Sequence, residues 1–358
     1  GLLVIANAAE QKEYFPALDP PFLRDTYTET TPSYRPDLKD KEVTTEWKYH
    51  KTADGSHPNG HEQQVVWLMN RARSNPTREG VWLAGSTDPN VARGRDYFGV
   101  DKNILKNEFA ALAVKPPAAF DNRLYAAAYA HSLDLIARDA QDHTHQFDRI
   151  RDAGFHFRSG RGSVFSYADS GINAHAAWNI DWGGNDEDGM QNPRGHRMAT
   201  MSADGNYTNV GIAAPRETNP GTSVGEYVTT GNYCLADTYY SDHYNQFIVG
   251  TVWTDRNGNN QYDPGEGEGN VTAKPDRGAF YAITGNSGGY AFPVGDGNHS
   301  VTFSGGGLPC NYAKSIVVGG KSVLIDIEIK SDFATYNCDN NPSTVPLPAI
   351  LHLLRDRP

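Results

Sequence analysis

The strongest chemical pattern in the sequence runs from Asp255 to Glu266. Counted from Asp255, side chains that carry oxygen fall at positions 1, 3, 5, 9 and 12, and position 7 offers its backbone carbonyl. Calcium takes several oxygen ligands from such a loop, and a bidentate Glu often comes last. We therefore predict a Ca²⁺ site whose ligands come from Asp255, Asn257, Asn259, Gln261, Asp263 and Glu266.

This spacing resembles the calcium loop of an EF-hand, but its context differs. Asn260 stands where a Gly is usual, and Asn also tolerates left-handed backbone angles. A strand-like run, Val249–Thr254, leads into the loop in place of a helix. Together with Gly288–Phe292, the region resembles the calcium-binding B-type repeats of bacterial surface adhesins over roughly residues 248–330. The alternative is an Asn- and Gly-rich turn that binds no metal.

The secondary structure expected from the sequence changes twice along the chain, from an extended arm to helices and then to short strands. Residues 10–59 are polar, rich in proline and without helical period, which predicts an extended arm. Helical periodicity then predicts a helix from Gly60 to about Pro76 and a longer one from about Asn122 to Ala140. Further expected elements are helices near 147–153, 172–180 and 194–201 and strands at 209–214 and 225–236. From Phe247 onward, short strand-like runs between Gly-, Asn- and Asp-rich turns predict a small β-sandwich.

An ordered series of short motifs extends from the second long helix into the strands after it. The motifs are Asp142-His143-Thr144-His145, Gly162-Ser163-Val164, Ala176-Ala177-Trp178, Gly195-His196-Arg197 and Asn209-Val210-Gly211-Ile212-Ala213. Their order resembles the bacterial branch of the CAP superfamily (cysteine-rich secretory, antigen 5 and pathogenesis-related proteins) over roughly residues 60–240. That resemblance implies an α-β-α sandwich with a central cleft lined by histidines and acidic residues.

The resemblance implies that His143 or His145, Ser163 and His196 line this cleft. Two neutral imidazoles with carboxylates can hold a metal such as Zn²⁺ or anchor a polar group. Ser163 replaces the acidic residue, so zinc is not expected, and His196 is expected to donate hydrogen bonds beneath the sheet. A triad of Ser163, His196 and Asp181 is less favoured, because Ser163 lies in no Gly-x-Ser-x-Gly turn.

Composition narrows the classes of partner. A net charge of −11 disfavours binding to nucleic acid and to anionic membranes. No run of about 18 apolar residues occurs, so no membrane span is expected. None of the three cysteines lies in a CxxC motif. A disulfide between Cys310 and Cys338 would leave Cys234 as a buried thiol, although the sequence leaves the pairing open.

Both ends of the sequence favour export. Gly1–Ala9 fits either the end of a signal peptide with an Ala-x-Ala cleavage site or an apolar strand at a mature terminus. In the second case, Leu2–Ala6 would add as a strand to another copy, which predicts a homo-oligomer or filament. Val345–Ala349 resembles part of a bacterial C-terminal sorting signal. We expect an extracellular or cell-surface location in bacteria.

These observations predict an α+β protein in four parts. The parts are an N-terminal arm (1–59), a CAP-like α-β-α domain (60–246), a calcium-binding all-β sandwich (247–334) and a C-terminal tail (335–358). The expected function is a non-catalytic structural or binding protein of the cell surface, because Ser163 disfavours chemistry in the cleft. The alternative is a hydrolase, or a small-molecule or lipid binder, that uses the cleft.

Overall fold

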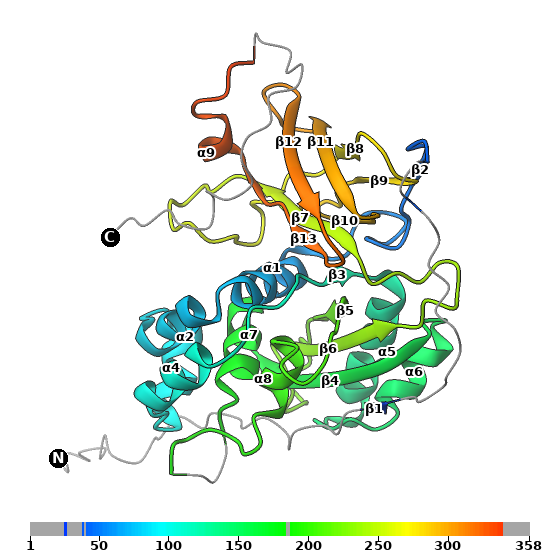
Figure 1. The fold of residues 1–358 in the computed structure, drawn as a ribbon. Helices are drawn as coiled ribbons and strands as arrows, with labels where there is room; N and C mark the ends of the chain where they lie inside the picture. Colours follow the sequence, from blue (N-terminus) through cyan, green and yellow to red (C-terminus); the bar gives the residue numbers. More distant parts are fainter. Residues whose placement is uncertain (1–24, 27–37, 39–40, 184–186, 339–358) are drawn as a thin grey trace, which may run out of the picture.

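The structure is a computed structural model that describes residues 25–26, 38, 41–183 and 187–338. Figure 1 shows a lower part in which helices surround a sheet and an upper part made mainly of strands. The lower part corresponds to the region where the sequence shows helical periodicity, and the upper part begins near Phe247. The predicted α+β class is confirmed at this level.

The first sheet runs, in spatial order, through β1 (Asp25–Thr26), β4 (Phe157–Ala168), β6 (Tyr227–Ala236), β5 (Asn209–Ala213) and β3 (Ala119–Phe120). β6 pairs antiparallel with both β4 and β5, whereas β3 is parallel to β5. Successive side chains of a strand point to opposite faces. Tyr233 and Cys234 accordingly belong to different hydrophobic clusters, so both faces of the sheet are buried.

One face of this sheet is covered by α1 (Gly60–Ser74), α7 (Gly171–Ile180) and α8 (Gly195–Thr200), with α2 (Pro76–Gly85), α3 (Pro89–Tyr97) and α4 (Lys102–Ala110) outside them. α1 begins at Asn59, whose side-chain oxygen accepts hydrogen bonds from the backbone N–H groups of His61 and Glu62. The Glu62 carboxylate accepts one in return from the Asn59 backbone N–H at 2.7 Å. This reciprocal cap holds the start of the predicted first helix in place.

The other face is covered by α5 (Asn122–Arg138) and α6 (Gln146–Asp152). Leu124 and Ala127 of α5 pack with Phe147 and Ile150 of α6 against Cys234. α5 is the longer helix that periodicity predicts, and its cap Asp139 has the left-handed φ of 49°.

The sequence patterns predicted neither β4 nor the helices α2 to α4. β4 contains two arginines and two glycines, which hide the alternation typical of a strand. The glycines are required by packing: a Cβ at Gly162 would lie 2.6 Å from the Gln146 side chain, and one at Gly160 would lie 3.1 Å from the Cys234 sulfur. The strand therefore depends on its neighbours in the fold.

Two further sheets share one hydrophobic cluster in the C-terminal part, and Ile248, Phe292 and Phe303 are fully buried there. One sheet contains β10 (Gly289–Pro293), β7 (Phe247–Trp253), β13 (Val323–Leu324) and β14 (Ile327–Glu328). The other runs through β12 (Tyr312–Val318), β11 (Gly297–Gly305), β8 (Val271–Pro275), β9 (Phe280–Ile283) and β2 (Thr45–Glu46). Cys310, just before β12, forms a disulfide with Cys338, which follows α9 (Ile329–Phe333), and Cys234 is a buried thiol.

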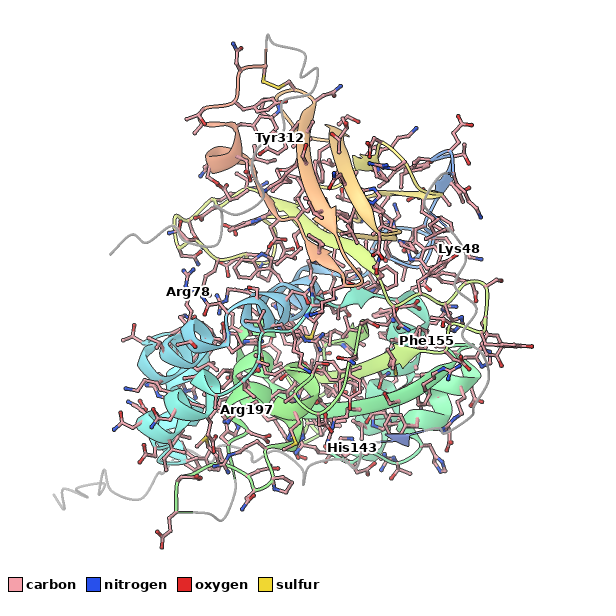
Figure 2. The ribbon with its side chains drawn as sticks, viewed as in Figure 1. Lys48, Arg78, His143, Phe155, Arg197 and Tyr312 are labelled. Carbon is pink, nitrogen blue, oxygen red and sulfur yellow. A yellow bond between two sulfur atoms is a disulfide. The ribbon has the colours of Figure 1, made fainter. Side chains whose placement is uncertain are left out.

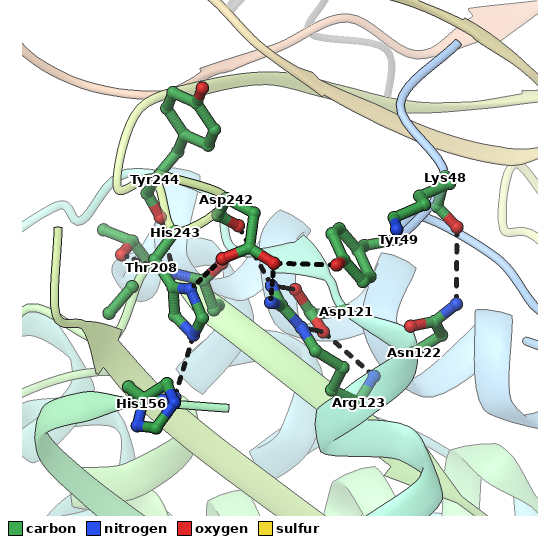
Figure 3. A network of polar contacts seen from close by, with 12 residues as sticks. Lys48, Tyr49, Asp121, Asn122, Arg123, His156, Thr208, Asp242, His243 and Tyr244 are labelled. Atoms are coloured by element: carbon green, nitrogen blue, oxygen red, sulfur yellow. Dashed lines mark hydrogen bonds and ion pairs between the residues drawn. The ribbon is translucent and has the colours of Figure 1, made fainter. Parts of the chain in front are cut away.

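The described part of the predicted arm packs onto both parts of the molecule. β2 pairs in parallel with β9, and Trp47 is buried in the cluster between the two C-terminal sheets. Figure 3 shows how the next residues join the first sheet region: the Tyr49 hydroxyl donates to the Asp242 carboxylate at 2.7 Å. Arg123 of α5 bonds to the same carboxylate at 3.1 Å and pairs with Asp121 at 2.7 Å. The arm, α5 and the segment leading to β7 are thereby tied together.

Candidate functional site

The predicted calcium loop follows β7 and lies over α1 (Figure 1). Its first residue, Asp255, is 8% exposed. The Asp255 carboxylate accepts hydrogen bonds from the backbone N–H groups of Gly258 at 2.7 Å and Asn260 at 2.9 Å. Asn260 has a φ of 59°, the left-handed angle that Asn tolerates. The Asp255 carboxylate therefore stabilises a tight turn in the residues that follow it.

The other predicted ligands close the loop from its far end. Glu266 is 4% exposed, and its carboxylate accepts hydrogen bonds from the backbone N–H groups of Arg256 at 2.8 Å and Asp263 at 2.9 Å. The side-chain nitrogens of Asn257 and Asn259 both donate to one oxygen of Asp263, each at 2.7 Å. Carboxylate and amide groups of three predicted ligands thus converge, and rotation of an amide would exchange its nitrogen for its oxygen.

The three carboxylates of the loop have no positively charged partner among the described residues, although Arg71 and Lys330 contact other groups of the loop. Across residues 41–183 and 187–338, Asp255, Asp263 and Glu266 form no ion pair with Lys, Arg or His, and their hydrogen-bond donors are neutral. Lys330 donates to the backbone carbonyl of Asp255 and not to its carboxylate. In the described part of the chain, no three His, Cys, Asp or Glu side chains are grouped as a metal site. A cation here would therefore need amide and carbonyl oxygens as well as carboxylates.

Two residues of α1, which the loop pattern could not reveal, hold the loop in position. The Gln64 side-chain nitrogen donates to the backbone carbonyl of Tyr262 at 3.0 Å and to the Asp263 carboxylate at 2.9 Å. Arg71 donates to the side-chain oxygen of Gln261 at 3.1 Å. These contacts join residues about 190 positions apart, so no local signal in the sequence could have identified them.

In the predicted cleft, the structure brings His143 and His196 together, with ring centroids 6.4 Å apart. His196 is fully buried at the start of α8. Its Nδ1 bonds to one oxygen of Asp181 at 2.8 Å, and its backbone N–H donates to the other oxygen at 3.0 Å. The backbone N–H of Arg197 donates to that second oxygen at 3.2 Å. Asp181 therefore fixes the orientation of the His196 ring.

His143 is held by a neutral partner. Its Nδ1 lies 2.7 Å from the side-chain oxygen of Gln146, and the Gln146 nitrogen donates to Asn232 at 2.8 Å. Burial, with a smaller contribution from the nearby His196, lowers the pKa of His143 to about 4, although the hydrogen bond to Gln146 acts in the opposite direction. The His143 imidazole is consequently neutral at physiological pH, the form that can bind a metal or accept a hydrogen bond.

The other two predicted cleft residues form no hydrogen bond to this pair of histidines. Ser163 is fully buried on β4 beside Tyr233, and it makes no hydrogen bond to His196. The hydroxyl-to-imidazole contact that a serine triad needs is therefore not formed. The side chain of His145 is 71% exposed and pairs with Asp148 at 2.9 Å on the surface. Figure 2 shows His143 near the opposite end of the molecule from Tyr312, which lies in the C-terminal sheets.

No protein-family model matches the chain, and a search of curated proteins finds no match. Among the helices of the described residues, none combines the length and the apolar character needed to cross a bilayer. The function of the protein is therefore inferred from its own loop and cleft.

Proposed function

We propose that this protein is a non-catalytic structural or binding protein of the bacterial cell surface or extracellular space. In this proposal a CAP-type α-β-α sandwich is joined to a β-sandwich that calcium stabilises. The observation that carries the proposal is the loop from Asp255 to Glu266, where three carboxylates receive only neutral donors. A Ca²⁺ ion would supply the missing positive charge. Rotation of the Asn257 and Asn259 amides, whose nitrogens donate to Asp263, would turn their oxygens towards the ion.

The position of the loop explains what calcium would do for the molecule. The loop follows β7 directly, and Gln64 and Arg71 attach it to α1. Trp67 of α1 meets Trp253 of β7 edge to face, with ring centroids 5.6 Å apart. A bound ion would thus stiffen the connection between the helical part and the C-terminal sheets, a useful property for a surface scaffold.

The CAP-type architecture and self-assembly are further parts of the proposal. The CAP-type architecture is supported by the helices on both faces of the first sheet and by the His143–His196 pair. The segment 1–9, expected to add as a strand to another copy, lies outside the described residues. Light scattering of the full chain and of a chain without residues 1–9 tests assembly. Equal molar masses for the two would refute assembly through this segment.

A hydrolase in the cleft is the alternative, and the buried Asp181–His196 pair is the observation that favours it. Turnover of ester and peptide substrates by the full chain, lost in a His196→Ala variant, would establish the hydrolase and refute the scaffold. We expect no turnover in either protein, because Ser163 does not reach His196.

Direct titration tests the calcium site. Calorimetry of the full chain with CaCl₂ should give one saturable site, which a double variant Asp255→Asn, Glu266→Gln abolishes. A control variant, Asp152→Asn with Glu42→Gln, removes two exposed carboxylates elsewhere and should bind like the wild type. Absence of binding to the wild type, or equal binding by the two double variants, would refute the site.

A further inference from the structure

A surface groove of about 780 Å³ lies between the α2–α3 connection and the predicted calcium loop. Trp82, Gly85 and Thr87 line one side, and Asn259 and Gln261 of the loop line the other. Ligand sites have volumes of about 300–1,000 Å³, so the groove is large enough for a ligand. It is open to solvent, because Gly85, Thr87 and Asn259 are all exposed.

The lining of the groove favours a neutral ligand rich in hydroxyl groups. Val81, which is 56% exposed, and the indole of Trp82 provide an apolar surface. The Gln261 side-chain oxygen accepts from Arg71, which leaves its amide nitrogen to donate to a sugar hydroxyl. The Asn259 amide donates to Asp263 through one N–H and has a second N–H to offer. Of the lining residues that the structure describes, Asp88 is the one charged residue and none is Lys, Arg or His, so the groove lacks the positive charges that bind phosphate or carboxylate groups. A carboxylate such as that of Asp88 can accept hydrogen bonds from sugar hydroxyls.

Arg71 of α1 contacts both sides of the groove, Trp82 on one side and Gln261 on the other. Its guanidinium lies 4.5 Å from the centre of the Trp82 ring and also donates to Gln261 at 3.1 Å. A buried Glu79 carboxylate holds the same guanidinium at 2.9 Å. The position of Trp82 is therefore linked to that of the loop, so an ordered loop also orders the groove.

From these observations we infer that the groove binds a segment of a neutral glycan, with Trp82 under a sugar ring and the loop amides on its hydroxyls. The expected calcium dependence of glycan binding rests on the proposed function, because Asn259 and Gln261 are predicted calcium ligands. The glycan site itself does not rest on the proposed function. Since coupling between two sites is reciprocal, glycan should also raise the affinity for calcium.

Gly85 offers a way to block the groove without disturbing the fold. A Cβ at Gly85 would meet no atom within 4 Å, and the residue ends α2 with an ordinary backbone angle. A Gly85→Gln side chain would therefore enter the groove while the helix keeps its packing. Gly319 is also free of neighbours within 4 Å but lies far along the chain in the β12–β13 turn, so Gly319→Gln is a matched control.

The test is calorimetric titration of the full chain with neutral hexasaccharides: cellohexaose, chitohexaose and maltohexaose. We expect at least one to bind in CaCl₂ and to bind about 5-fold or more weakly in EGTA, within the usual range of coupling. Gly85→Gln should abolish binding, whereas Gly319→Gln should retain it. The melting temperature of Gly85→Gln should match that of the wild type.

Two outcomes overturn the glycan site: no binding by any hexasaccharide in CaCl₂, or unchanged binding by Gly85→Gln. Binding of a proline-rich peptide in place of the sugars would also overturn it. Sugar binding without a calorimetric signal for calcium would refute the calcium site and support the glycan site. A calcium signal without sugar binding would do the reverse.

Discussion

The predicted calcium loop and the predicted cleft give buried acidic groups different hydrogen-bond partners. In the predicted cleft, the Asp181 carboxylate has three partners within the protein: the backbone N–H groups of His196 and Arg197 and the His196 ring. In the loop, the buried carboxylates of Asp255 and Glu266 receive only backbone N–H groups. A side-chain partner inside the protein makes a buried carboxylate independent of a bound ion, whereas clustered carboxylates with neutral donors are stabilised by a cation.

Removal of the Asp181 side chain should have the largest effect. An Asp181→Ala variant leaves the backbone N–H groups of His196 and Arg197 and the His196 ring without their acceptor. Each buried donor left alone costs about 1–3 kcal/mol, so the free energy of unfolding should fall by about 3 kcal/mol or more. Urea unfolding at pH 7 measures it, and the loss should be the same in CaCl₂ and EGTA. A loss that vanishes in EGTA would contradict the independence of Asp181 from a bound ion.

Calcium removal should have the next largest effect. A cation at about 100 times its dissociation constant stabilises the folded state by roughly 2.7 kcal/mol. EGTA should therefore lower the melting temperature of the wild type, but not that of the Asp255→Asn, Glu266→Gln variant. Protease sensitivity near the exposed Asn259 should rise in parallel. Identical melting of the wild type in CaCl₂ and EGTA would contradict the prediction.

Acid should act on the cleft through His143. Its folded pKa of about 4 lies below the ordinary value of 6.5, so between these values the unfolded chain binds more protons. Stability should therefore be complete above pH 6.5 and decline as the pH falls towards 4, with a loss from this residue of about 1–2 kcal/mol between pH 6.5 and about pH 5. His143→Gln should show a shallower decline in thermal melts from pH 7 to 4. A slope equal to that of the wild type would contradict this assignment.

The contact between Gln64 and the loop should have the smallest effect. Gln64→Leu removes the donor to Asp263 and to the Tyr262 carbonyl. A net hydrogen bond contributes about 1 kcal/mol, so calcium affinity should fall by about fivefold or less. Calorimetry with CaCl₂ measures the change, and Gln63→Leu, which loses a bond to Thr251 outside the loop, is the control. Equal affinities for the two variants would contradict a role for α1 in holding the loop.

The sequence patterns predicted those helices and strands whose hydrophobic periodicity is evident within the segment itself. The helix at Gly60–Ser74 and the strands at Asn209–Ala213 and Phe247–Trp253 match runs with clear period and flanking turn residues. The patterns predicted neither α2 to α4 nor β4. Both α2 and α3 begin at a proline and contain glycine, residues that are typical of loops, and the glycines and arginines of β4 mask its alternation. Gly162 can be explained only by the Gln146 side chain, which comes from another element.

For the predicted calcium loop, the sequence by itself determined the order and spacing of the oxygen-bearing residues from Asp255 to Glu266. This was possible because residues within one short loop are close in space whatever the rest of the chain does. Only the tertiary structure decided that Gln64 and Arg71 support that loop. It also separated His143, which meets His196, from His145, which faces solvent, although the two are only two residues apart. Spacing along the chain sets local geometry, whereas burial and long-range partners depend on how distant segments pack.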